Sequence, residues 1–192
     1  MSTMKKLLLL LILLTAGLPG FSRIVDDEKG FTLGVGFGVW NETLHIASRK
    51  LHHIDWIGSV RVGYRITPDV EAGIVLGRRD DRGSRYIVST GVYGEYCFKR
   101  AGQFRVFADG EFADILSRNY YGGPKMDGIE FGIRPGVAYK LKNLPIDLKL
   151  RYLFLGFNNL SRVLRTEACL GGGNWIVDAG LNRLEIGAAV TF

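Results

Sequence analysis

Apolar side chains alternate one by one with polar residues or glycine through eight separate segments of this chain. Successive side chains of an extended strand point to opposite faces, so each segment predicts a β-strand with one apolar face. The eight segments cover residues 31–40, 55–66, 70–77, 86–98, 104–112, 129–140, 146–154 and 183–192. In the seventh segment the apolar face carries Ile146, Leu148, Leu150, Tyr152 and Phe154, opposite Asp147, Lys149 and Arg151. The pattern predicts an all-β fold, and 192 residues suffice for one ordinary domain.

The connections between these segments alternate in length. The short connections cover residues 67–69, 99–103 and 142–145, and the long ones cover residues 41–54, 78–85, 113–127 and 158–182. Short turns at one end and long loops at the other are typical of a transmembrane barrel, whereas a soluble β-sandwich has no reason to place every long loop at one end. We therefore expect a single eight-stranded antiparallel up-and-down transmembrane β-barrel.

The two faces of the predicted strands differ in charge. A sheet in hydrocarbon satisfies its backbone only by closing, so the apolar face must point outward and the polar face inward. An eight-stranded barrel is just wide enough for its side chains to fill it. We expect a polar network in the lumen, formed by Arg61, Arg65, Glu71, Glu95, Arg105, Asp109, Glu111, Glu130, Arg134, Arg151 and Glu185.

Acidic and basic residues nearly balance in this set, as buried charges must, and the narrow lumen favours a salt-bridged plug over an ion or proton path. Gly34, Gly36 and Gly38 on the same face leave room for a thin water path along one wall. Aromatic residues near the short turns are typical of the girdle that lies at a membrane interface. They are Tyr64, Tyr96, Phe98, Tyr139 and Phe192.

The N-terminal segment has the pattern of a cleavable signal peptide. Lys5 and Lys6 precede the apolar run 7–14, which is followed by small and turn-forming residues up to Ser22. The run is too short for a transmembrane helix, which needs about 20 residues. We expect a signal peptide over residues 1–22 and a barrel over residues 23–192. Removal of the two lysines lowers the net charge from +6 to +4, too weak an excess for a nucleic-acid-binding protein.

Two positions interrupt the regular pattern. Pro135 falls inside the sixth segment, where it cannot donate a ladder hydrogen bond. A bulge is favoured because the alternation continues on both sides, and the alternative is a turn that would split the strand. In the first long connection, Asn41 could cap a single helical turn that carries the stripe Leu44, Ala47, Leu51 and Ile54.

The signal peptide, the alternation, and the stretches 131–139 and 184–192 together resemble the small outer-membrane β-barrel proteins of Gram-negative bacteria, often called porin-like. The chain is similar in architecture to the membrane domain of outer-membrane protein A. The resemblance covers the mature chain and implies a monomer in the bacterial outer membrane, exported through the periplasm and in contact with outer-membrane lipid and lipopolysaccharide. We expect no peptidoglycan-binding module after Phe192.

In this family the barrel-assembly machinery reads a final strand that ends in an aromatic residue. The resemblance assigns that role to Ile186, Ala188, Val190 and Phe192. The family also includes lipid A deacylases and palmitoyl transferases, which pair a histidine with a hydroxyl group. Here the three histidines, His45, His52 and His53, all lie in the first long connection.

A transferase-like site would need one of these histidines together with Asp80, Asp81 or Ser84 of the next long connection. Several polar residues in neighbouring loops are expected by chance, so we assign no catalytic residue. Adjacent histidines point in opposite directions in an extended segment, so His52 and His53 with Asp55 make a poor metal site. We expect no enzymatic activity, no metal and no cofactor.

The two cysteines, Cys97 and Cys169, are predicted at opposite ends of the barrel, too far apart for a disulfide. Cys97 is expected to fill space in the lumen. The expected function is a non-enzymatic barrel with a structural role and a surface-interaction role, in which four extracellular loops can present a binding surface to an extracellular ligand. The alternatives are a narrow porin for small solutes or ions and an outer-membrane lipid A-modifying enzyme.

Overall fold

The computed structural model describes residues 29–46, 49–81, 85–119, 121–123, 125–160, 169–170, 174–180 and 183–192. The predicted signal peptide lies outside these residues. Among the described residues, no helix is long and apolar enough to cross a membrane.

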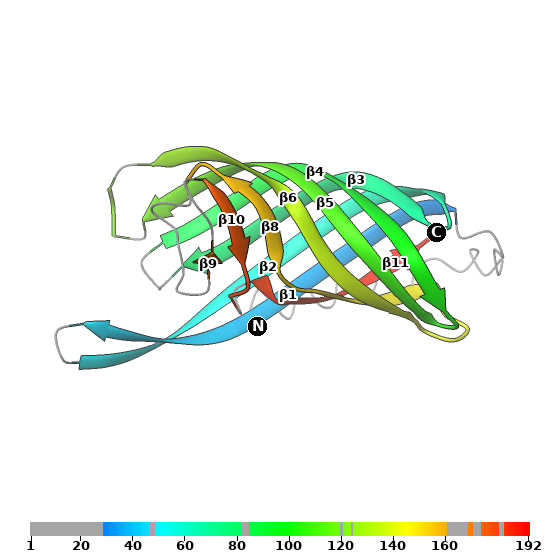
Figure 1. The fold of residues 1–192 in the computed structure, drawn as a ribbon, viewed down its shortest axis with the longest axis horizontal. Helices are drawn as coiled ribbons and strands as arrows, with labels where there is room; N and C mark the ends of the chain where they lie inside the picture. The colour runs from blue at the N-terminus through cyan, green and yellow to red at the C-terminus, as the bar shows by residue number, and fades with distance from the viewer. Residues whose placement is uncertain are drawn as a thin grey trace, which may run out of the picture.

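Eleven strands form one continuous sheet that closes on itself (Figure 1). They are β1 (Gly30–Ile46), β2 (Arg49–Thr67), β3 (Val70–Asp81), β4 (Arg85–Ala101), β5 (Phe104–Asn119), β6 (Met126–Lys140), β7 (Ile146–Arg151), β8 (Phe154–Asn158), β9 (Cys169–Leu170), β10 (Trp175–Asp178) and β11 (Glu185–Thr191). Each consecutive pair from β1 to β6 is antiparallel, and β11 closes the ring by pairing with both β1 and β7.

Ten of the eleven strands make the eight positions of the barrel wall, here called staves, and the two-residue β9 adds to the edge of β10. β7 and β8 both pair with β6 and are two parts of one stave. β11 pairs with β7 while β10 pairs with β8, so these two form the last stave, interrupted between residues 179 and 184. The remaining staves are β1 to β6. The predicted closed, eight-stranded antiparallel barrel is therefore confirmed.

A bulge separates β7 from β8. Gly136 of β6 pairs with Arg151, whereas Ile133 pairs with Leu155, so three residues on the seventh stave oppose two on β6. Leu153 lies within this bulge and has a left-handed backbone with φ of 72°. One additional residue reverses the side chains that follow, because the faces of a strand alternate.

The reversal corrects the predicted position of Phe154. The alternation placed this side chain on the outward face, but it is only 1% exposed and lies in the lumen. Leu155 takes the outward position and is 39% exposed. The sequence pattern misplaced Phe154 because nothing in the apolar run marks where the additional residue lies.

Pro135 lies in an unbroken strand, so the alternative of a turn is wrong. It pairs with Ala108 of β5 without a register shift in that ladder. Its carbonyl accepts a hydrogen bond from the backbone N–H of Tyr152, and the N and O of one residue point to the same side of a strand. The missing N–H therefore faces the interruption between β7 and β8. The bulge predicted within this segment is therefore wrong for β6, and the additional residue lies instead on the neighbouring strand, at residues 152–154.

The first three long connections are mostly strand. β1 and β2 pair continuously to Ile46 and Arg49, so the helical turn predicted in this region is wrong for residues 41–46 and 49–54. The β1–β2 hairpin projects beyond the rest of the barrel (Figure 1). Likewise β3 and β4 pair up to Asp81 and Arg85, and β5 reaches Asn119.

The alternation did not predict these extensions because, above the apolar band, apolar residues lie on the inner face and polar residues on the outer face. In the upper part of β5, Ala113 and Ile115 are buried in the lumen, while Asp114 is exposed on the outside. A strand that has left hydrocarbon meets water on its outer face and packs on its inner face. A prediction that requires apolar residues outside and polar residues inside therefore ends each strand before its true end.

The predicted last loop also contains structure. β8 continues to Asn158, and β10 pairs with β8 on one edge and with β9 on the other. Cys169 begins β9, and Cys97 is a buried free cysteine near the β4–β5 turn. The 99–103 connection that follows Cys97 is short, as predicted, because β4 ends at Ala101 and β5 starts at Phe104.

The outward face is an apolar band between two levels of aromatic residues. Tyr64, Tyr96 and Phe98 lie near the short turns and are 46%, 57% and 57% exposed. In β2 the next aromatic residue on this face is Trp56, eight positions from Tyr64. Eight residues span about 26 Å along a strand, or roughly 20 Å along the axis of a barrel whose strands tilt by about 40°. This height approaches that of the apolar band of a membrane barrel.

Candidate functional site: the filled lumen

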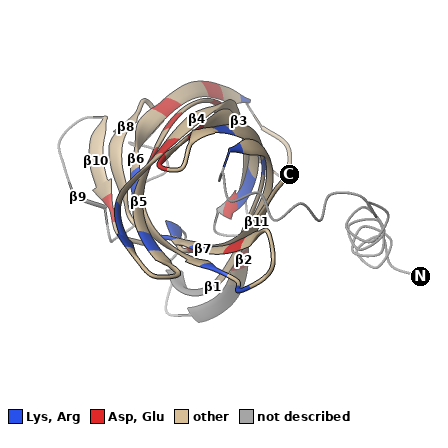
Figure 2. Ribbon diagram, turned by 90° about the vertical axis from the view of Figure 1, so that its right-hand side faces the viewer, with Lys and Arg blue, Asp and Glu red and all other residues tan. Residues whose placement is uncertain are grey.

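All eleven charged residues predicted to face the lumen are buried inside the barrel. Charged residues of both signs are distributed around its wall when it is viewed along the axis (Figure 2). Because the strands are antiparallel neighbours in a closed ring, one face of every stave converges on the same narrow interior. The alternation therefore brings residues from distant parts of the sequence together.

Near the short turns, Asp147 joins two arginines. Its carboxylate lies 2.9 Å from Nη2 of Arg65 and 2.5 Å from Nη2 of Arg105. Arg65 also contacts Glu71 at 3.2 Å. Glu71 in turn lies 3.7 Å from Nζ of Lys149, so the pairs extend upward from the turns as a chain.

In the middle of the barrel, Lys149 and Arg151 share the carboxylate of Glu95 at 2.7 Å and 3.4 Å. Arg151 also donates from Nε to Oδ2 of Asp109 at 2.9 Å. Asp109 is fully buried and accepts a second hydrogen bond of 2.6 Å from Nη1 of Arg61. The two arginines therefore depend on one carboxylate oxygen.

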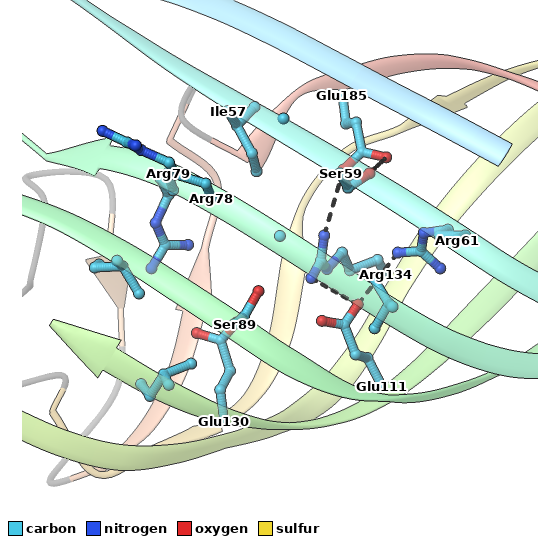
Figure 3. A pocket seen from close by; sticks show the side chains of 15 residues that line it. Ile57, Ser59, Arg61, Arg78, Arg79, Ser89, Glu111, Glu130, Arg134 and Glu185 are labelled. Atoms are coloured by element: carbon cyan, nitrogen blue, oxygen red, sulfur yellow. Dashed lines mark hydrogen bonds and ion pairs between the residues drawn. The ribbon is translucent and has the colours of Figure 1, made fainter. Parts of the chain in front are cut away.

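Higher in the lumen, Glu111 accepts hydrogen bonds from Arg61 at 3.2 Å and from Arg134 at 2.8 Å. Glu185 lies between Arg134 and Arg151, at 3.8 Å and 3.3 Å, and accepts a hydrogen bond of 2.9 Å from Ser59. Figure 3 shows from close by the contacts of Glu111 with Arg61 and Arg134, and those of Glu185 with Ser59 and Arg134.

We call this connected set the lumen network. It consists of Arg61, Arg65, Glu71, Glu95, Arg105, Asp109, Glu111, Arg134, Asp147, Lys149, Arg151 and Glu185. Among the described residues it has six carboxylates and six cations, so its formal charge is zero. Buried charges are tolerated where each has a partner of opposite sign, and here every member has at least one.

Glu130 is the one predicted residue outside the lumen network. It pairs with Arg183 at 3.1 Å and accepts a hydrogen bond of 2.7 Å from Nδ2 of Asn158. Arg183 also contacts Asp178 at 2.7 Å and lies over the ring of Phe154, 4.5 Å from its centroid. This upper cluster of Glu130, Asn158, Asp178 and Arg183 holds the interruption between β10 and β11 against the wall.

The prediction omitted two members of the lumen network, Asp147 and Lys149. Their signal was present, since both alternate with apolar residues in the seventh segment. Tyr93 also lay on the polar face, and its hydroxyl donates a hydrogen bond of 2.7 Å to Glu71. Asp178 and Asn158 gave no such signal because both fell in the predicted last loop.

Lumen-facing glycines make room for large side chains. A Cβ on Gly36 would lie 2.0 Å from Oε1 of Glu185, and one on Gly63 would lie 2.3 Å from the hydroxyl of Tyr93. A Cβ on Gly38 would meet the backbone carbonyl of Leu184 at 2.1 Å. The expected water path along Gly34, Gly36 and Gly38 is therefore largely filled. Only Gly34 borders a small cavity.

Apolar side chains fill the lumen on both sides of the network. Toward the short turns, Cys97 packs with Phe107 and Ala138, all buried, as expected for Cys97. At the other end Ile57, Val75, Ile87 and Ile115 surround one cavity and are at most 7% exposed. We call these four residues the apolar plug. The sequence pattern missed these residues because they are apolar on the inner face, where the search expected polar side chains.

Among the described residues, two small cavities lie between these parts. The cavity below the apolar plug, shown in Figure 3, has a volume of about 30 Å³ and is also lined by Arg61, Glu111 and Arg134. A second cavity of about 10 Å³ lies beside Glu71 and Lys149. These volumes hold a few waters and about one water, respectively. Neither has room for a solute.

In the part of the chain that the structure describes, no group of three or more His, Cys, Asp or Glu side chains could hold a metal ion. Asp80 is buried on β3. The side chains of His45, His52, His53 and Asp81, and all of Ser84, lie outside the described residues. The chemistry that the lumen network supplies is the mutual neutralisation of buried charges.

The last strand presents its predicted face outward. Ile186 is 61% exposed and Phe192 is 37% exposed, while Ala189 between them is buried. Val190 and Ala188 are half-buried on the same face as Ile186. The backbone N–H of Phe192 donates to the carbonyl of Phe31, so the end of the chain is held against β1.

Two solved structures share this arrangement of strands. The crystal structure of Neisserial surface protein A superposes with a TM-score of 0.54 at 16% sequence identity, covering 84% of this chain and 96% of that one. The N-terminal β-barrel domain of Pseudomonas aeruginosa OprF gives a TM-score of 0.53 at 18% identity, covering 85% and 98%. The chain has the fold of these eight-stranded barrels. No protein-family model and no curated protein matches the sequence.

Proposed function

We propose that this chain is a non-enzymatic outer-membrane β-barrel that has a structural role and presents its long hairpins as an interaction surface. One observation supports this proposal most: apolar side chains are exposed around the wall, whereas twelve charged residues are paired inside. A soluble protein has the opposite arrangement. In water such an outer surface would aggregate. In a bilayer it is the surface that a closed sheet requires.

The filled lumen favours a structural barrel over the alternative of a narrow porin. A solute would have to pass the apolar plug and then break pairs such as Arg61 with Asp109 and Arg134 with Glu111. Removing one partner from a buried pair costs about 3–5 kcal/mol. Several such pairs lie one above another along the path.

We also propose how the chain is exported and assembled in the membrane. Residues 1–22 serve as the signal peptide, residues 23–192 form the barrel, and the mature chain crosses the periplasm to the bacterial outer membrane. There it is a monomer surrounded by lipid and lipopolysaccharide. Ile186, Ala188, Val190 and Phe192 supply the signal for the barrel-assembly machinery, which the exposed face of β11 supports.

The mature chain, refolded into lipid vesicles and then studied in a planar bilayer, tests this proposal. We expect a folded band on gels that shifts after boiling, and no step-like conductance in the folded state. A water-soluble chain without a heat-dependent shift would contradict the membrane barrel. A shifted band with steady conductance would favour the narrow porin.

A further inference from the structure

An arginine is held between two aromatic rings on the outward face of the wall. The guanidinium carbon of Arg78 lies 5.2 Å from the ring centroid of Trp56 and 4.7 Å from that of Tyr86. The three residues come from β2, β3 and β4. The ring of Trp56 can lie close to the sheet because its neighbour is Gly58, where a Cβ would be 3.1 Å from the ring.

The position of Arg78 marks the upper edge of the lipid-facing band. Ile74 and Leu76 precede it on the same face of β3 and are 55% and 51% exposed. The side chain of Arg78 is 44% exposed even with both rings against it and Asp80 at 3.8 Å. In the proposed orientation, with the short turns in the periplasm, this level is the headgroup region of the outer leaflet.

A second arginine lies on the same face. Arg118 pairs across the β4–β5 ladder with Tyr86, so the order along the outer rim is Trp56, Arg78, Tyr86, Arg118. The Nε atom of Arg118 is buried and has no hydrogen-bond partner among the described residues. A guanidinium nitrogen without a partner is costly, and the Arg118 side chain is half-buried on the outward face, so its guanidinium group can turn toward an oxyanion there.

We infer that this patch of Trp56, Arg78, Tyr86 and Arg118 binds a phosphate group of lipid A in the outer leaflet. The inference rests on the proposed membrane location. Guanidinium groups recognise phosphate through parallel N–H donors. Two rings that hold Arg78 in place reduce the entropy lost when a phosphate binds. Lipid A supplies the phosphate at the level where the arginines lie, which solutes in the bulk do not.

Native mass spectrometry of the refolded, folded chain mixed with lipid A measures the retained lipid. We expect Arg78→Ala and Arg118→Ala each to weaken lipid A binding about tenfold, the effect of losing one charge-assisted contact. Arg78→Lys keeps the charge without the planar group, should fold like the wild type, and should bind at an intermediate level. The matched control is Arg100→Ala, which removes an exposed arginine near the short turns and should leave binding unchanged.

Three further probes identify the ligand. Dephosphorylated lipid A should bind as weakly to the wild type as intact lipid A binds to Arg78→Ala, and neither inorganic phosphate nor phosphatidylglycerol vesicles should compete. The inference is overturned if Arg78→Ala and Arg78→Lys bind like the wild type, if Arg100→Ala weakens binding equally, or if dephosphorylated lipid A or phosphatidylglycerol matches intact lipid A. In each of these cases a heat-shifted band still supports the proposed barrel, whereas its absence from the wild type contradicts the proposed function.

Discussion

Asp109 is the residue on which the centre of the lumen network depends most directly. It is fully buried, and its Oδ2 atom accepts hydrogen bonds from both Arg61 and Arg151. Asp109→Ala would leave two buried guanidinium groups without this partner, and we expect it to lower the free energy of unfolding by about 3 kcal/mol or more. Urea titration of the refolded barrel, followed by tryptophan fluorescence, measures the change.

Asp69 provides the control for this substitution. It pairs with Arg100 at 2.7 Å, but both side chains are substantially exposed. Exposed pairs contribute about 0–1 kcal/mol, so Asp69→Ala should change stability little. If Asp109→Ala and Asp69→Ala had equal effects, the lumen network would not be a source of stability.

Gly36 shows how a small residue supports a large one across the lumen. Because its absent Cβ would collide with the carboxylate of Glu185, Gly36→Ala must push Glu185 away from Ser59 and Arg151. We expect a loss of about 1–3 kcal/mol, as for other overpacked sites. In a Glu185→Ala background the same substitution should cost much less, since the effects of residues in contact are not additive.

Urea titration of the single and double variants checks this coupling. Gly94→Ala is the matched control, because a Cβ at Gly94 meets no atom within 4 Å. It should leave stability unchanged or raise it slightly. Additive effects of Gly36→Ala and Glu185→Ala would show that the two residues do not share the space.

Alternation identified the face of each charged residue but not its partners. Arg61 and Asp109 lie 48 positions apart, and nothing local in either strand indicates that they meet. Their pairing depends on the register of every ladder between them, which is set by turn lengths and bulges. For this reason the sequence indicates which charged residues face the lumen. It does not indicate that Glu130 lies apart from the lumen network.

At the level of the strands, the bulge at Tyr152 and Leu153 sets the faces of β8. Deletion of Leu153 would leave two residues opposite two on β6, so Phe154 would stay in the lumen and Leu155 would stay outward. Phe154 then keeps its place over Arg183, and the upper cluster keeps its packing. We therefore expect the deletion variant to keep the heat-shifted folded band on gels.

Pro135 on the neighbouring strand makes the complementary comparison. Its missing N–H faces the interrupted stave, so Pro135→Ala restores a donor where there is no regular ladder to accept it. We expect this variant to fold with a stability within about 1 kcal/mol of the wild type. A deletion of Leu153 that lost the folded band while Pro135→Ala kept it would show that folding requires the additional residue itself.

Periodicity predicted the strands well within the apolar band and poorly above it. Alternation predicted the eight staves because hydrocarbon outside requires an apolar residue and the polar lumen requires a polar residue at the next position. Above the band, Ile87 and Ile115 pack inside and Arg78 lies outside, so the demand reverses and the pattern no longer marks a strand. The long hairpins were missed for this reason, and the apolar plug was missed because its residues are apolar on the inner face.

For the whole molecule, the membrane location predicts how stability depends on depth. Ile74 is 55% exposed and lies between Val62 and Val92, which are also exposed on the outward face. In hydrocarbon, Ile74→Arg should cost about 2–4 kcal/mol. Leu144 is similarly exposed, at 49%, but lies in the short turn between β6 and β7. Leu144→Arg should change stability by about 0.5 kcal/mol or less, as at most surface positions.

Urea titration of both variants in lipid vesicles separates a membrane barrel from a soluble one. If the outward face were in water, an arginine would be tolerated equally at Ile74 and Leu144, since the two side chains have nearly the same exposure. Exposure alone therefore cannot produce the expected difference. A difference requires that the solvent around the band is hydrocarbon and that the solvent around the turn is water. Equal, small effects would remove the basis for an apolar outer face, and with it the reason for placing the charges inside.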